Sequence, residues 1–364
     1  MTAPAVTGSV LARPAAVVNR RRTAVLSGVA IAVPLAFALA VMLGSTSIPV
    51  EQALRALVRD GAADPGVQEI VWTVRLPRAI TAALAGAALS ASGVQLQTLF
   101  RNPLAEPYIL GVSSGASLGV ALIIIGWGGA AGAFTAGVAG LGRAGVVVAA
   151  SAGAAAVLAL VLVLSRRVRS VVTLLIIGVM VGSAAVSVIT LLLVYTDPQR
   201  AQQFIMWGLG SFAGTTWADL AVFAPVCLAA LAGALAGVKS LNALLLGENY
   251  AHTMGVKVRT VRTLTLLISS VLAGAVTAYC GPIAFLGLAV PHVARLLLGT
   301  ADHRVLMPGV MLLGAATALV CCVATQAPGS GVVLPLNAVT TILGAPVVIA
   351  VLLRSRTART GPAV

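Results

Sequence analysis

"VVTLLIIGVMVGSAAVSVITLLLV", residues Val171–Val194, contains no charged side chain. The stretch exceeds the ~20 apolar residues that an α-helix needs to cross the hydrocarbon core of a bilayer. Similar stretches recur along the whole chain. Because backbone polar groups in lipid must be satisfied within a helix or a closed barrel, these stretches predict an all-α polytopic membrane protein.

We predict about ten transmembrane helices, an even number that puts both ends of the chain on one side of the membrane. Small residues fill these helices, which is typical of membrane bundles whose backbones approach closely. The predicted spans cover residues 23–44, 78–98, 107–126, 144–164, 171–194, 218–237, 262–280, 284–298, 305–324 and 338–353.

Composition and charge support this class of protein. The chain is 59% hydrophobic and 9% charged, whereas soluble domains carry about 25% charged residues. The net charge of +14 would suit a nucleic-acid partner, but most Lys and Arg fall on one side of the predicted spans. That asymmetry is the positive-inside rule, so this side is cytoplasmic and no nucleic acid is expected.

The charge asymmetry also fixes the predicted organisation of the chain. A cytoplasmic tail covers residues 1–22, a transmembrane domain covers 23–353, and a second cytoplasmic tail covers 354–364. Tryptophan favours membrane interfaces, and the four tryptophans fall at the outer ends of spans. They are Trp72, Trp127, Trp207 and Trp217.

No residue pattern indicates catalysis, a resident metal or a cofactor. The stretch "GALAGVKS" (233–240) resembles a nucleotide-binding loop, but Val238 separates the Gly from the Lys that the motif requires next to it. The cysteines lie within or beside apolar spans without metal-site spacing, as buried small hydrophobic residues do. They are Cys227, Cys280, Cys321 and Cys322. We therefore expect no enzyme activity, and energy for any uphill transport would come from a partner.

Acidic residues are scarce inside the predicted spans: Asp219 lies near the outer end of one, and the other Asp and Glu fall in loops or at span ends. Ion-coupled transporters usually keep ionisable groups near the middle of the membrane. The scarcity disfavours an ion-coupled secondary transporter, although carbonyls and hydroxyls alone can hold sodium. A membrane scaffold without transport activity is a further alternative.

A first polar motif, "RLPR" (Arg75–Arg78), lies at the outer mouth of the second span. One interpretation is a pair of cationic anchors that snorkel to the interface. The other is a pair of exposed cations that meet carboxylates on an external partner.

A second motif, "RNPLAEPYILGVSSGASLG" (Arg101–Gly119), leads into the third span. Pro103 and Pro107 prevent a continuous helix. The following Gly and Ser residues permit close helix packing. The motif can therefore be interpreted either as a structural break or as a direct contact with the cargo.

The third motif, "LLGENYAHTMGVKVRTV" (Leu245–Val261), is a polar segment between two apolar spans, on the predicted cytoplasmic side. Gly247 and Gly255 bracket a short segment in which Glu248 and Ala251 can share one helical face. A solvated loop and a docking helix for a soluble partner are the two interpretations.

A fourth motif, "GPIAFLGLAVPHVARLLLGTADHRVLMPG" (Gly281–Gly309), combines a span containing Pro291 with the charged turn Asp302–Arg304. We expect His292 and Arg295, near its cytoplasmic end, to be solvated or snorkelled.

These motifs, together with "TTILGAPVVIAVLLR" (Thr340–Arg354), resemble the FecCD family of permeases from ABC importers for iron–siderophores, haem and cobalamin. The resemblance runs in order along nearly the whole chain. It implies a type II ABC importer permease bundle in a bacterial cytoplasmic membrane, working by alternating access in a dimer. The implied partners are a cytoplasmic ATP-binding subunit, a periplasmic or lipid-anchored substrate-binding protein, and a second permease copy or paralogue.

The resemblance also implies roles for two of the motifs. The coupling segment at about 240–260 would dock on the ATPase through Gly247, Glu248, Ala251 and Gly255, and Arg75 and Arg78 would dock the binding protein. A ferric siderophore is the expected cargo, with haem or cobalamin as alternatives.

The chain departs from the family pattern before the last span. Gln326 and Val333 stand where the family typically has Arg and Glu, and Asn337 stands for a Gly. The departure puts a third docking cation and the geometry of that outer loop in question. Pairing with a different permease paralogue would suit such an asymmetry.

Overall fold

The structure is a computed structural model that describes residues 15–59, 64–124, 143–168, 170–327 and 332–357. Trp127, residues 1–14 of the predicted N-terminal tail and residues 358–364 of the predicted C-terminal tail lie outside the described residues.

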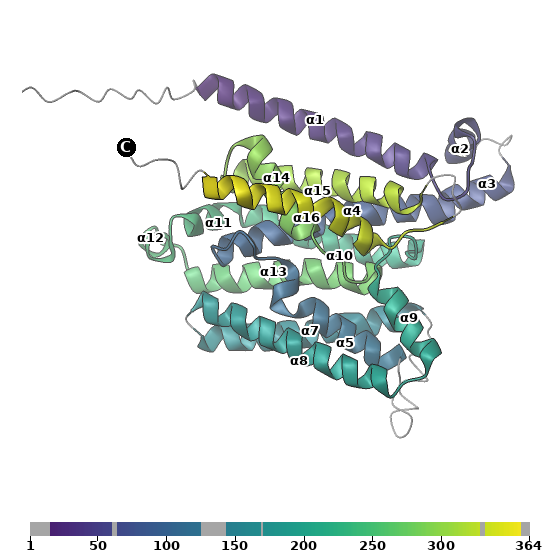
Figure 1. The fold of residues 1–364 in the computed structure, drawn as a ribbon. Coiled ribbons are helices and arrows are strands. Elements are labelled where there is room, and N and C mark those ends of the chain that lie inside the picture. The colour runs from purple at the N-terminus through teal and green to yellow at the C-terminus, as the bar shows by residue number, and fades with distance from the viewer. Residues whose placement is uncertain (1–14, 60–63, 125–142, 169, 328–331, 358–364) are drawn as a thin grey trace, which may run out of the picture.

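Within the described residues, ten apolar helices lie in the ten predicted spans, which confirms the all-α polytopic class (Figure 1). Seven are long and apolar enough to cross a membrane, and three are shorter. The ten are α1 (Ala15–Met42), α4 (Leu76–Leu99), α5 (Val112–Ile124), α7 (Arg143–Arg167), α8 (Val171–Val194), α10 (Trp217–Ala236), α13 (Val258–Cys280), α14 (Leu286–Leu298), α15 (His303–Thr325) and α16 (Leu336–Thr357).

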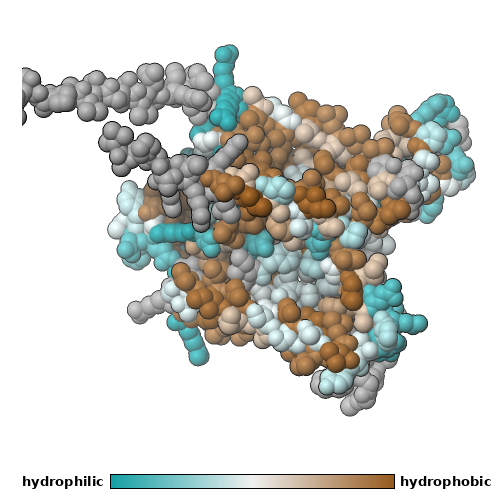
Figure 2. All heavy atoms as spheres, viewed as in Figure 1, coloured by the Kyte–Doolittle hydropathy of each residue, from teal (hydrophilic) through white to brown (hydrophobic). Residues whose placement is uncertain are grey.

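Short helices gather at the two ends of this bundle, and Figure 1 shows them on opposite sides. At one end lie α2 (Val50–Leu57), α3 (Pro65–Glu69) and α9 (Pro198–Gly208); at the other lie α11 (Val238–Leu245) and α12 (Glu248–Thr253). The start of α1 and the end of α16 are on the side of α11 and α12. In Figure 2, hydrophobic residues make up much of the visible flank of the bundle, with paler residues between them, and strongly hydrophilic ones collect near its ends, as is typical of a membrane-embedded protein.

Helix α4 is the centre of the bundle. It continues α3 and the π-helical turn η1 (Ile70–Arg75), and most of its residues are buried. It packs against α15, α13, α14 and α10. Glycines permit these contacts, because a Cβ at Gly86 would collide with the backbone of Gly314, and one at Gly93 with that of Gly287.

The predicted break between the second and third spans is confirmed. α4 ends at Leu99, Arg101 adopts a left-handed conformation, and a short 3-10 helix, η2 (Pro107–Leu110), precedes α5. Gly111 has a φ of +75°, and a Cβ there would lie 3.0 Å from the carbonyl oxygen of Gly178 on α8. This second motif therefore acts at least as a structural turn.

Candidate functional site

The third motif folds as two short helices joined by a glycine hinge. α11 ends at Leu245, and α12 begins at Glu248. Gly247 between them has φ +121° and ψ 149°, and Gly255 after α12 has φ +80°. Residues with a Cβ rarely adopt such angles, so the two glycines define how α12 leaves its neighbours.

Within α12, Glu248 and Ala251 have different environments. Ala251 is fully buried among apolar residues, whereas the Glu248 side chain is 39% exposed. Oε1 of Glu248 accepts a 2.8 Å hydrogen bond from Nη2 of Arg262 on α13, whose own side chain is only 10% exposed. The two residues predicted to share a face therefore have different roles: Ala251 packs against the bundle, and Glu248 forms an ion pair that links α12 to α13.

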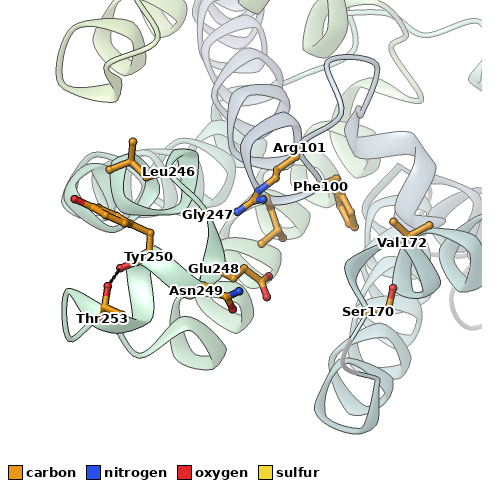
Figure 3. A pocket seen from close by; sticks show the side chains of 11 residues that line it. Phe100, Arg101, Ser170, Val172, Leu246, Gly247, Glu248, Asn249, Tyr250 and Thr253 are labelled. Atoms are coloured by element: carbon orange, nitrogen blue, oxygen red, sulfur yellow. Dashed lines mark hydrogen bonds between the residues drawn. The ribbon is translucent and has the colours of Figure 1, made fainter.

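A groove of about 830 Å³ lies beside this ion pair (Figure 3). Its walls are the end of α4, the start of α8, and the α11–α12 hinge. In Figure 3 the Arg101 guanidinium points toward Gly247, and it donates a 3.4 Å hydrogen bond to the Leu244 carbonyl oxygen. Glu248, from α12, also lines the groove. The groove presents both charges and apolar walls at the end of the bundle.

Large apolar side chains are exposed along the same segment. Leu246 is 65% exposed, Tyr250 54% and Met254 59%. These three residues were not predicted from the sequence, where the charged residues and glycines of the motif carried the interpretation. The signal that could have identified them is one aromatic and two other apolar side chains within an otherwise polar stretch. Exposed apolar residues rimmed by polar ones mark protein interaction sites.

The first motif differs from its prediction. Arg75 and Arg78 are 2% and 3% exposed, so the interpretation of exposed cations at the outer mouth is wrong. Arg75 donates to the carbonyl oxygens of Val41 (3.1 Å), Met42 (2.5 Å) and Thr46 (2.9 Å). Arg78 donates to those of Ala40 (3.1 Å) and Leu43 (3.2 Å).

The physical reason for this burial is the end of α1. The last carbonyls of a helix have no intrahelical partner and carry partial negative charge, so cations stabilise them. Arg75 and Arg78 supply those cations from η1 and α4. Docking of a binding protein by Arg75 and Arg78 stays a prediction, to which the burial of both side chains gives no support.

The fourth motif is also more buried than expected. His292 is 7% exposed, and its Nδ1 lies 2.7 Å from the Leu288 carbonyl oxygen. Arg295 donates from Nη1 to Oε1 of Gln97 on α4 at 2.6 Å. The close packing of α14 on α4 through Gly287 explains why these side chains turn inward instead of toward solvent.

Glu106, in the loop of the second motif, is another partly buried charge. Burial raises the pKa of its carboxyl group. The neighbouring Tyr108 hydroxyl accepts a hydrogen bond from the backbone N–H of Ile283, which attaches this loop to the segment before α14.

The departures from the family pattern have definite places in the fold. Asn337 accepts from the N–H of Ala284 at 3.1 Å and donates to the carbonyl oxygens of Gly208 and Pro282 at 3.1 and 2.7 Å. Gln326 is buried at the end of α15, and Val333 is 55% exposed. Asn337 therefore joins the start of α16 to the end of α9 and to the segment before α14, contacts that a glycine, which has no side chain beyond hydrogen, cannot make.

The described residues form a bundle of ten apolar helices with a grooved, partly apolar surface at one end, which defines a polytopic membrane protein. The comparison with known proteins gives the family: the chain belongs to the FecCD transport family, whose model matches residues 31–354.

Individual relatives cover most of the chain. The hemin transport system permease protein HmuU of Yersinia pestis is 36% identical over 80% of this chain and 85% of its own length. The uncharacterized ABC transporter permease protein YvrB of Bacillus subtilis is 36% identical over 87% and 89%. The vitamin B12 import system permease protein BtuC of Klebsiella pneumoniae is 35% identical over 79% and 84%.

A solved structure has the same fold. It is an inward-facing conformation of a putative metal-chelate type ABC transporter, with a TM-score of 0.78 and 29% sequence identity. The alignment covers 91% of this chain and 99% of that one. The chain is accordingly a type II ABC importer permease.

Proposed function

We propose that this protein moves a metal chelate inward across the bacterial cytoplasmic membrane. The observation that carries the proposal is the family match over residues 31–354, combined with relatives named for hemin and vitamin B12 transport. A ferric siderophore, haem and cobalamin are the three candidate cargoes. Each is a large chelate, and the relatives support haem and cobalamin as well as they support a siderophore.

The α11–α12 segment is the proposed docking site for a cytoplasmic ATP-binding subunit. The hinge at Gly247, the turn at Gly255 and the inward anchor Ala251 hold α12 in one orientation, with Glu248 fastened to Arg262. Leu246, Tyr250 and Met254 then form an exposed apolar contact surface beside the groove. Apolar and aromatic side chains at the centre of an interface commonly dominate its binding energy.

The proposed transport cycle needs no reaction within this chain. ATP binding and hydrolysis in the partner displace α12, and the helices around the pathway tilt between inward- and outward-open arrangements. A periplasmic or lipid-anchored binding protein delivers the chelate to the opposite end. A second permease copy or a paralogue completes the pathway, and both termini lie in the cytoplasm.

The test is reconstitution with the ATP-binding subunit and the binding protein in proteoliposomes. Haemin, cyanocobalamin and ferrichrome are supplied separately, and import is measured with ATP, without ATP, and with a collapsed ion gradient. We expect ATP-dependent import of one chelate class that survives collapse of the gradient. Import that continues without ATP but stops with the gradient would replace this proposal with an ion-coupled transporter.

A further inference from the structure

Polar side chains connect three helices at the end of the bundle that carries α11 and α12. Asn242 on α11 donates from Nδ2 to Oδ1 of Asp302 at 2.6 Å, and its Oδ1 accepts from the backbone N–H of His303 at 2.8 Å. The His303 ring lies between Asn242 and Thr98 of α4, 2.8 Å from each. His303 is 1% exposed and Thr98 4%.

The hydrogen-bond donors and acceptors fix the direction of this chain of contacts. A backbone N–H can only donate and a carboxylate can only accept, so the Asn242 amide has one possible orientation. Nδ1 of His303 must then carry a hydrogen and donate to Oδ1 of Asn242. Nε2 lies 2.8 Å from the Thr98 hydroxyl oxygen, which is also 2.9 Å from the Val94 carbonyl oxygen within α4. The imidazole thus bridges α11 and α4.

Asn242 also completes the N-terminus of α15. The first N–H groups of a helix have no intrahelical acceptor, and here the N–H of His303 uses an oxygen from another helix. Asp302 accepts the next one, from Arg304, at 2.9 Å, and this backbone hydrogen bond lowers the pKa of the Asp302 carboxyl group. Helices α11 and α15 are therefore joined where α15 begins.

The other end of α11 leads directly into the proposed docking surface. Only Leu246 and Gly247 separate it from α12, and the N–H of Gly247 donates to the Leu244 carbonyl oxygen at 3.1 Å. Leu241 and Leu244 are buried, which holds α11 against the bundle. A displacement of α12 therefore reaches Asn242 through a short, packed segment.

We propose that Asn242, His303 and Thr98 are positioning residues that transmit movement of the α11–α12 segment to α4 and α15. The inference rests on the proposed function, because the movement is the one that an ATPase would impose. Packing alone would let α11 slide over α4, whereas directional hydrogen bonds oblige both helices to move together.

The test uses Thr98→Val, which removes the hydroxyl and keeps the shape of the side chain. Thr81→Val is the matched control: Thr81 is buried on the same helix, and its hydroxyl contacts that of Thr215 at 2.8 Å, far from α11. The complex with the ATP-binding subunit and the binding protein is assayed for ATPase co-purification, ATP hydrolysis and import of whichever of haemin, cyanocobalamin or ferrichrome the wild type moves.

We expect Thr98→Val to retain the ATPase and hydrolyse ATP while the number of chelates imported per ATP falls about two- to tenfold, which corresponds to losing the one buried hydrogen bond that crosses to His303; the contact with Val94 lies within α4. Thr98→Ser, which restores the hydroxyl, and Thr81→Val should keep the wild-type ratio. Asn242→Ala should resemble Thr98→Val and takes its place if that variant does not assemble.

An unchanged import per ATP in Thr98→Val or Asn242→Ala would overturn the inference. An equal fall in Thr81→Val would also overturn it, because packing in general would then be responsible. Failure of the wild-type protein to recruit an ATPase would contradict the proposed function instead.

Discussion

Arg262 of α13 donates from Nη2 to Oε1 of Glu248 on α12 at 2.8 Å, across the turn at Gly255 that separates the two helices. The cation is largely buried and the carboxylate is partly exposed. Glu248 therefore helps to position α12 through a contact within the chain, whether or not it also touches a partner.

This ion pair gives the first prediction. Glu248→Lys puts two cations together and should release α12, with reduced co-purification of the ATPase. Because Glu248 is 39% exposed, solvent screens the pair, and we expect the neutral change Glu248→Gln to cost only about 1 kcal/mol of association free energy. The double reversal Glu248→Arg with Arg262→Glu should recover association. A double reversal as defective as Glu248→Lys would mean that Glu248 meets the ATPase directly.

The second prediction concerns the buried cation at the end of α1. Arg75→Ala removes three hydrogen bonds to carbonyl oxygens of the α1 terminus and the following turn. Hydrogen bonds from charged groups contribute about 1.5–3 kcal/mol each before relaxation, so the Tm of the detergent-solubilised protein should fall by several degrees.

Arg55→Ala is the matched control for that change. Arg55 forms an exposed pair with Glu51 at 2.6 Å on α2, worth about 0.3–0.5 kcal/mol in such a geometry. Its Tm should stay near the wild-type value. Equal Tm values for Arg75→Ala and wild type would contradict a structural role for Arg75.

The third prediction concerns the close approach of α4 and α14. A methyl group at Gly93 would collide with the Gly287 carbonyl oxygen, so Gly93→Ala must separate the helices at a cost of about 1–3 kcal/mol. Gly28→Ala, in α1 with nothing within 4 Å of the added carbon, should be neutral or slightly stabilising. Thermal stability in detergent checks both changes; a stable Gly93→Ala protein would show that the two helices separate freely.

The fourth prediction concerns orientation. In a background without the four native cysteines, Asn249→Cys on α12 should react in intact cells only with a membrane-permeant thiol reagent. Gln199→Cys on α9 should react with an impermeant one as well. Both native side chains are exposed, so burial does not limit either reaction. The reverse pattern of labelling would place α12 outside the cell and rule out ATPase docking there.

Sequence reasoning predicted the elements of this fold well because their causes are local. The apolar length of a span sets whether it can cross a bilayer, and this holds whatever the neighbours are. The prolines at 103 and 107 broke the helix by removing N–H donors and by steric clash. The hinge at Gly247 followed from the backbone angles that only glycine adopts readily.

The candidate site was predictable in position but not in orientation. The segment at about 240–260 was identified from its polarity and glycines, and the structure folds it as a distinct surface. Whether Ala251 or Tyr250 faces outward depends on what lies beneath α12, which no local pattern specifies. The exposed apolar side chains Leu246 and Met254 were missed for the same reason.

The sequence by itself determined the membrane class, the ten spans, and the glycine and proline breaks between them. Tertiary structure alone decided that Arg75 caps the end of α1 and that His303 meets Thr98, 205 residues away in the chain. From sequence alone, a charged or polar residue is predicted to be exposed, because burying it without a hydrogen-bond partner is costly. The partners that offset this cost are carbonyl and hydroxyl groups on distant helices, and only folding brings them within hydrogen-bond distance.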